Sequence, residues 1–502
     1  MASSILRCAA AAVPLFFLAP LLAAQPSAPV DPAIAGALQQ VSAQNIRATI
    51  EKLVTFNNRS TLSSMETDLP SGTGVTAAAD WIFSEFERTS AACAGCLEVK
   101  RDDFIEPAVA GSRITRPTRI QNIYAVLKGT DPAQAARRVL VTGHYDSRNT
   151  DVFDTHNPAP GANDDSSGVA VSLECARVLS KLKFPSTIIF VAVAGEEQGL
   201  NGSRHLAKLA KAEGWQLEAV LNNDIVGGDT TPGATGADKS AVRVFSEGVP
   251  GTTTLDQLHA IQTIGAESDS PARELARAVT EIGRTYFQPT DHRATVTPGR
   301  PHSMAIRHDP AFHPVLIFRR DRFLRGGDHT SFSLEGFPAI RFTEWQENFN
   351  HQHQNLHTEN GIQFGDLIQF DDFDYIANVA RINAATLATL ASAPGAPQNV
   401  GVVTTNLDND TTLRWQPPVG MPAGTTFQVV TRDSNAPDWT NVIPAGAGTS
   451  ITLHISKDNT IFGIRSADAA GHHSAAVYPL PIRAAGAAPV PGTSPPPTSA
   501  KP

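Results

Sequence analysis

The sequence predicts an α/β domain with a mostly parallel sheet and helices on both faces, followed by a small all-β sandwich. Apolar strand-like runs alternate with helical patterns from residue 25 to about 392, and this alternation is typical of α/β domains. A linker, SAPGAPQN, follows at 392–399. Beyond it, short alternating runs are separated by turn residues, as in the strands of a sandwich. We therefore expect two folded parts, 25–392 and 396–484.

Buried strands and helices can be placed within the first part. Continuous apolar runs predict strands at 137–143, 186–195, 218–227 and 336–345. The stretch SGVAVSLECARVLSKL at 167–182 has apolar residues at helical spacing. A further helix is expected to begin at Pro271, with Ser270 as its N-cap.

The second part has strand patterns of its own, and Trp415 is expected in its core. Its last run resembles the end of a fibronectin type III domain, in which an aromatic-x-aliphatic strand precedes a D-x-x-G-x-x-S turn. The matching residues are Phe462, Ile464, Asp468, Gly471 and Ser474. Thr460 stands where many such domains have a tyrosine.

The two ends of the chain predict export and a flexible tail. Residues 1–24 have a basic Arg7, an apolar run and small residues before Gln25, which is the pattern of a secretory signal peptide. Pro14 and Pro20 interrupt the run, so a membrane anchor is the weaker interpretation. Residues 485–502 are rich in proline and predict a disordered tail. We expect a periplasmic or extracellular protein with no stable membrane insertion.

Composition and cysteines fit this view. The chain has 502 residues, 41% of them hydrophobic, and a formal charge of −9; neither disorder nor nucleic-acid binding is indicated. In an exported protein, Cys93 and Cys96 in CAGC predict a local disulfide. Cys175 is expected to be a small buried residue.

Polar groups gather where the predicted strands end. His144 and Asp146 follow one strand, Glu196 and Glu197 the next, and Asp224 a third. In open parallel sheets, ligands bind beyond the carboxyl ends of the strands. Two glycine-flanked loops, GANDDSSG at 161–168 and GGDHTSF at 326–332, add further carboxylates and His329. Imidazole with carboxylate and without thiolate suits Zn²⁺, so the sequence predicts a metal site.

The ordered motifs resemble a zinc aminopeptidase family, that of bacterial leucyl aminopeptidase and aminopeptidase Y (clan MH). The resemblance covers roughly residues 40–390. It is carried by TGHYDS, PGANDDSSG, AGEEQGLNGSRHLA, LNNDIVG and GGDHTSF, with NLHTEN as a variant of the family's later histidine segment.

The resemblance implies two zinc ions and a role for each site residue. It assigns His144 and Asp224 to one zinc, Glu197 and His329 to the other, and Asp164 to both. Asp165 would be structural, with a cis peptide bond between Asp164 and Asp165. Asp146 would orient His144 through a hydrogen bond.

Glu196 would be the general base of peptide hydrolysis, and substrates would carry a free N-terminus. Because consecutive side chains at a strand end point in different directions, Glu197 can face a metal while Glu196 faces the attacking water. His351 and His353 are expected to lie outside the metal site, and His357 to line the pocket. The arginines before His329 either anchor a substrate carboxylate or form a solvated basic loop.

Three other interpretations of the function remain open. The first is a di-zinc carboxypeptidase or deacylase of the carboxypeptidase G2 type, which uses a similar set of ligands. The second is a glutaminyl cyclase with a single zinc. The third is a non-catalytic relative of the same fold. The sandwich is the part that could bind a surface or polymer, or it could only stabilise the enzyme.

Overall fold

The computed structural model describes residues 28–231, 238–287, 312–405 and 408–482. The predicted signal peptide at 1–24 and tail at 485–502 lie outside these ranges. Within them, no helix combines the length and apolar character needed to cross a membrane.

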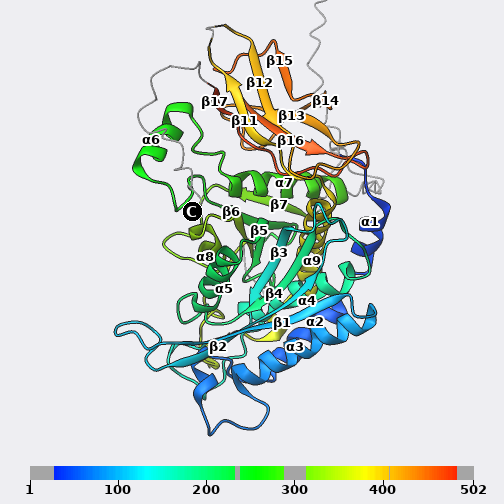
Figure 1. Ribbon diagram of the computed structural model, residues 1–502. Helices are drawn as coiled ribbons and strands as arrows, with labels where there is room; N and C mark the ends of the chain where they lie inside the picture. The colour runs from blue at the N-terminus through cyan, green and yellow to red at the C-terminus, as the bar shows by residue number, and fades with distance from the viewer. Residues whose placement is uncertain (1–27, 232–237, 288–311, 406–407, 483–502) are drawn as a thin grey trace, which may run out of the picture.

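An eight-stranded mixed sheet forms the centre of the larger part (Figure 1). In spatial order its strands are β1 (Leu97–Glu106), β2 (Thr118–Leu127), β4 (Thr187–Val193), β3 (Arg137–His144), β5 (Gln216–Asn223), β8 (Ala339–Glu344), β6 (Ala241–Ser246) and β7 (His313–Ile317). The central strands β4, β3, β5 and β8 are parallel. β2 joins them antiparallel at β4, and β6 antiparallel at β8. The expected parallel sheet is therefore the centre of a mixed one.

Helices cover both faces of this sheet. One face packs against α3 (Gly74–Ala92), α4 (Ser167–Leu179), α7 (Pro271–Tyr286) and α9 (Phe373–Ser392), and α1 (Pro32–Gln39) and α2 (Ala43–Val54) cover α4 and α9 from outside. The other packs against α5 (Asn201–Ala212) and α8 (His329–Leu334). Side chains alternate along β3 accordingly: Val139 and Val141 enter the first core, and Leu140 enters the second. Helix α6 (Leu255–Ile264) has no buried residue.

Short elements complete this part. They are the turns η1 (Thr61–Met65), η2 (Ala162–Ser166) and η3 (Ile368–Phe370) and the hairpin of β9 (His357–Glu359) and β10 (Ile362–Phe364).

The expected elements coincide with observed ones. All four predicted strands overlap β3, β4, β5 and β8, and the predicted helix at 167–182 is α4. Helix α7 begins at Pro271, and the Ser270 hydroxyl accepts a hydrogen bond from the Arg273 amide at 3.1 Å. The flanking strands β1, β2, β6 and β7 were not predicted. β1 carries six charged residues out of ten at the edge of the sheet, so it lacks the apolar run of a buried strand.

The C-terminal part is a sandwich of two sheets. One sheet has the order β15 (Ser450–Leu453), β12 (Thr411–Gln416), β11 (Gln398–Val403) and β17 (Leu480–Ile482). The other has the order β14 (Asn441–Gly446), β13 (Thr426–Asp433) and β16 (Thr460–Ala467). As expected, Trp415 lies in the core between them, where its ring centroid is 5.5 Å from that of Phe427.

The sandwich lies against α7 (Figure 1) and is joined by buried ion pairs to α7 and to the residues just before it. Arg432 of β13 binds both carboxylate oxygens of Asp269, at 2.6 and 2.9 Å. The indole N–H of Trp439 donates to Glu274 at 3.0 Å. Because these groups are buried, the contact fixes the position of the sandwich.

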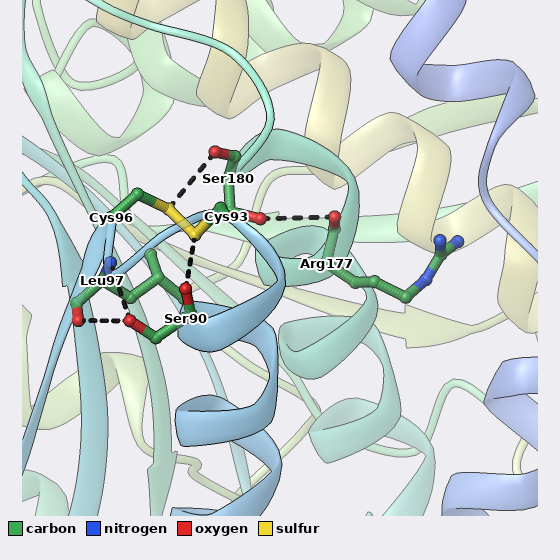
Figure 2. The surroundings of a disulfide bond; sticks show 6 residues. All are labelled: Ser90, Cys93, Cys96, Leu97, Arg177 and Ser180. Atoms are coloured by element: carbon green, nitrogen blue, oxygen red, sulfur yellow. Dashed lines mark hydrogen bonds between the residues drawn. A yellow bond between two sulfur atoms is a disulfide. The ribbon is translucent and has the colours of Figure 1, made fainter.

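The predicted disulfide joins Cys93 to Cys96 where α3 ends and β1 is about to begin (Figure 2). Its two sulfur atoms lie near the carbonyl oxygens of Ser90 and Ser180, the second of which follows α4. The bridge therefore lies between the ends of α3 and α4. Cys175 is free and fully buried, as expected.

Candidate metal centre

Three neighbouring parallel strands place polar side chains at one edge of the sheet. β3 ends at His144, β5 ends one residue before Asp224, and β4 ends shortly before Glu196 and Glu197. Because the spatial order is β4, β3, β5, these ends are adjacent. These residues therefore lie together beyond the carboxyl ends of adjacent strands, as expected from the sequence.

Glycines let the Asp164 loop approach the strand ends. A Cβ atom on Gly143 of β3 would lie 2.4 Å from the carbonyl carbon of Gly168 in α4, and one on Gly168 would lie 2.2 Å from the carbonyl oxygen of Asn223. Both distances are closer than any side chain permits. The peptide bond between Asp164 and Asp165, just before α4, is cis, as the resemblance implied.

Asp165 anchors this loop. Its carboxylate accepts hydrogen bonds from the His144 amide at 2.9 Å and from the Gly168 amide at 2.9 Å. This side chain is fully buried and binds backbone groups of two elements, which fits the structural role expected for it.

The first group of potential metal ligands consists of His144, Asp164 and Asp224. The Nε2 atom of His144 lies 3.1 Å from Oδ1 of Asp164 and 3.9 Å from Oδ1 of Asp224. All three residues are buried, and their donor atoms lie within 4.8 Å of one another.

The second group consists of Asp164, Glu197 and His353. The Nε2 atom of His353 lies 2.9 Å from Oδ2 of Asp164 and 3.0 Å from Oε1 of Glu197. Asp164 thus presents one carboxylate oxygen to each group, which is the arrangement expected of a bridging ligand.

His329 is the point at which the structure departs from the sequence-based ligand set. It begins α8, and its Nε2 atom lies 2.8 Å from the carbonyl oxygen of Arg320 and 3.6 Å from Asp321. It belongs to neither donor group. His353, expected to lie outside the site, takes the corresponding place from the loop after β8. Three histidines share the segment NHQHQNLH, and its composition does not tell which one faces the site.

The neighbouring histidines point elsewhere. His351 stacks on Phe370, with ring centroids 3.8 Å apart, and lies 3.6 Å from Asp229. His357 is exposed and stacks on Phe364 in the β9–β10 hairpin. It is not among the residues that line the cavity described below.

Asp146 orients the parts of the site around it. The Nδ1 atom of His144 lies 3.0 Å from the Asp146 carbonyl oxygen and 3.4 Å from its carboxylate. That carboxylate accepts hydrogen bonds from the Glu197 amide at 3.1 Å and the Thr61 hydroxyl at 2.9 Å. Contacts of this kind fix the ring orientation of a metal-binding histidine and raise its basicity.

The electrostatics of the donor groups favour a bound cation. Burial lowers the pKa of His353, but the Glu197 and Asp164 carboxylates outweigh burial and raise that pKa to about 10. The carboxylates thus stabilise positive charge between them. Carboxylate and imidazole donors with no thiolate match the ligands of Zn²⁺, so these five residues fit a zinc centre.

Glu196 lies beside this centre but in neither donor group. Burial raises its pKa well above the usual carboxylate range, and the nearby carboxylates of Asp224 and Glu197 raise it further. A carboxylate with a raised pKa holds a proton more readily, which suits a group that must accept one.

A cavity of about 700 Å³ opens above the donor groups. Its floor includes Asp164, Glu196, Glu197, Asp224 and His353. Its walls include basic and apolar side chains, which are Arg113, Arg148, Arg322, Arg325, Leu200, Leu324 and Phe349. A substrate in this cavity would therefore meet negative charge at the floor and positive charge on the walls.

Comparisons with known proteins agree with a metallopeptidase site. The model of Peptidase family M28 matches residues 122–269. A probable zinc metalloprotease of Leptosphaeria maculans is 44% identical over 88% of this chain and 96% of its own length. One of Pyrenophora teres f. teres is 42% identical over 90% and 88%. The solved LapA aminopeptidase of Legionella pneumophila is 21% identical, with a TM-score of 0.46, over 72% of this chain and 74% of that one. On the strength of the curated relatives, the chain belongs to Peptidase family M28 and is a zinc metallopeptidase.

Proposed function

We propose that this protein is an exported aminopeptidase that hydrolyses the first peptide bond of peptides with a free N-terminus, using two zinc ions. The observation that carries the proposal is the pair of donor groups that share Asp164, beside Glu196 at the floor of the cavity. His144 and Asp224 would hold one ion, Glu197 and His353 the other, and Asp164 both. The two ions would lower the pKa of a water molecule and polarise the carbonyl group of the substrate.

The remaining roles fall to side chains of this protein. Glu196 takes the proton of the attacking water and passes it to the nitrogen of the leaving amine, as a general base and then a general acid. Asp146 keeps His144 and the Glu197 backbone in place. The carboxylates of the floor also favour a substrate ammonium group, which supports a preference for a free N-terminus.

A carboxypeptidase of the same fold is the second candidate, and a specific observation favours it. Arg148 lies on the cavity wall, with its Nε atom 4.0 Å from Glu197, where it could bind a terminal carboxylate. A glutaminyl cyclase with one zinc is less well supported, because a second donor group is present.

The N- and C-terminal regions add two finer proposals. We infer export from the signal-like sequence at 1–24. We also infer that the sandwich is a fibronectin type III-like module that stabilises the catalytic part, since buried ion pairs join it to Asp269, just before α7, and to Glu281 of α7.

The test uses mature protein from Gln25 and one hexapeptide in three forms: free, N-acetylated and C-terminally amidated. We expect cleavage of the free and amidated peptides, no cleavage of the acetylated peptide, and loss of activity with a chelator that zinc restores. Cleavage of the acetylated peptide but not of the amidated one would assign a carboxypeptidase instead. No cleavage of any form by the zinc-loaded protein would contradict both peptidase proposals.

A further inference from the structure

The arginines of the cavity wall differ in how their charge is neutralised. Arg322 uses all of its guanidinium nitrogens: Nε binds Asp321 at 3.0 Å, Nη1 binds Glu347 at 2.9 Å, and Nη2 binds the Gly326 carbonyl at 2.9 Å. Arg325 binds the same Glu347 at 2.6 Å. Arg322 and Arg325 of the basic loop before His329 are thus paired with carboxylates of their own surroundings.

The other two arginines of the wall have no carboxylate closer than 4.0 Å within the described part of the chain. Arg113 donates to the backbone oxygen of Glu197 at 2.6 Å, whereas Arg148 faces the carboxylate of that residue. The Nε atom of Arg148 donates to the Asn149 carbonyl at 3.1 Å, and this is the single hydrogen bond that its guanidinium makes among the residues that the structure describes. The nearest carboxylate there is that of Glu197, at 4.0 Å. The side chain is 16% exposed, so it is partly removed from water without a close ionic partner.

With zinc bound at the proposed centre, the positive charge of the Arg148 guanidinium would be balanced even less by Glu197. Glu197 is one of the donors, and a ligand carboxylate shares its charge with the metal ion. A half-buried guanidinium with free donors is suited to bind a carboxylate in bidentate fashion.

The loop that carries Arg148 is held beside the metal centre. The Thr150 amide donates to the Asn355 side chain at 3.3 Å, and the Asn355 amide donates to the Thr150 hydroxyl at 3.2 Å. Asn355 lies two residues after His353, one of the potential donors of the second group. Arg148 and His353 therefore belong to two loops that are tied together.

We propose that Arg148 binds a carboxylate of the substrate located one residue beyond the cleaved bond, so that the enzyme favours dipeptides or peptides with an acidic second residue. This inference rests on the proposed aminopeptidase function. The cavity floor would receive the substrate amine, the zinc centre the scissile carbonyl, and Arg148 the carboxylate.

The test measures kcat and KM for two pairs of substrates. The first pair is Leu-Ala and its C-terminal amide. The second is a pentapeptide amide with aspartate or asparagine as its second residue. Because a charge-assisted bidentate contact is among the stronger polar interactions, we expect the acid of at least one pair to be favoured about 10- to 100-fold in kcat/KM. The pair that shows the preference identifies the source of the carboxylate.

Variants then assign the preference to Arg148. Arg148→Gln should abolish it, mainly by raising KM for the acid while the amide or asparagine substrate is unaffected. Arg148→Lys, which keeps the charge but not the fork of donors, should retain part of it. Arg325→Gln, on the same cavity wall but paired with Glu347, is the matched control and should keep the preference. Zinc content is measured for each variant.

Two results would overturn the proposal. One is the absence of a preference for the acid in both pairs with wild-type protein. The other is an equal loss for acid and neutral substrates in Arg148→Gln, which would mean that Arg148 only positions Glu197. A third result would separate the two proposals. If the enzyme cleaves N-acetylated dipeptides and the preference for the acid still depends on Arg148, the aminopeptidase proposal is wrong and the carboxylate site is retained.

Discussion

Two buried clusters of charged side chains differ in how their carboxylates are compensated. Between α7 and the sandwich, Asp269 and Glu274 meet the guanidinium groups of Arg277 and Arg432. All four side chains are at most 3% exposed. These four side chains supply two cations and two anions, and each of them has an ionic partner within the protein.

At the strand ends, carboxylates outnumber the permanent cations. Asp164, Glu197 and Asp224 gather around two imidazoles, and Arg341 binds one of the three, Asp224, at 2.8 Å. Burying a carboxylate without a cation is costly. The arginine-balanced cluster is therefore complete as a structural joint, whereas the carboxylate-rich one requires added positive charge, such as metal ions.

Replacing His353 and His329 in turn tests which histidine binds the second metal ion, and this test has the largest expected effect. In His353→Gln the second donor group loses its imidazole, so we expect roughly one zinc ion fewer per chain and loss of peptidase activity. His329→Gln is the matched variant. It should bind zinc as wild type does, since its ring lies against the Arg320 carbonyl. Metal analysis of the purified proteins checks both, and the reverse pattern would restore the sequence-based assignment.

Replacing Glu196, the proposed general base, should lower the catalytic rate without removing bound zinc. Glu196 lies on the cavity but outside both donor groups, so Glu196→Gln should keep its full zinc content. Its kcat should fall about 10²- to 10⁴-fold, the usual contribution of a positioned base. Zinc analysis and steady-state kinetics on the same preparation provide the measurement. A fall in zinc content matching the fall in kcat would make Glu196 a ligand instead.

His353 differs from the other proposed ligands in how far a sequence pattern can locate it. His144, Glu197 and Asp224 lie at or just beyond the ends of apolar strands, so the sheet places them and the pattern predicts them. Asp164 lies in a glycine-flanked loop immediately before a helix. These local rules hold because strand and helix periodicity determine where each side chain emerges.

His353 obeys no such rule. It lies in an irregular loop with a positive φ of 57°, among three histidines and several amides. Its direction depends on long-range contacts such as those between Thr150 and Asn355. The edge strand β1 was missed for a related reason, because its charged sequence pairs with β2 through the backbone. In the sequence, the cluster of histidines in NHQHQNLH indicates that one of them could bind metal, but it does not indicate which one.

Breaking the balanced cluster should destabilise the protein strongly. Arg432→Met removes a guanidinium that binds both oxygens of Asp269, leaving a buried carboxylate short of a partner. We expect a loss of about 3–5 kcal/mol in the free energy of unfolding, measured by urea denaturation. Arg88→Ala is the control: its side chain is 77% exposed in its pair with Glu85, and its loss should be below ~1 kcal/mol. Equal effects would contradict the role of the joint.

A histidine at the same interface should make the protein less stable in acid, with a smaller effect than Arg432→Met. Burial and the neighbouring Arg465 lower the pKa of His473 to about 3, and this ring lies 3.3 Å from an Arg465 nitrogen that also binds Glu281. As the pH falls below the unfolded value near 6.5, the unfolded chain takes up a proton that the folded chain refuses. Stability should therefore decline by about 1.4 kcal/mol per pH unit from this group. Unfolding free energies at pH 7, 6 and 5 should show a shallower decline in His473→Gln. In His454→Gln, whose native side chain is 91% exposed, the decline should match wild type. If the unfolding free energy declines equally with falling pH in all three proteins, His473 does not cause the loss of stability.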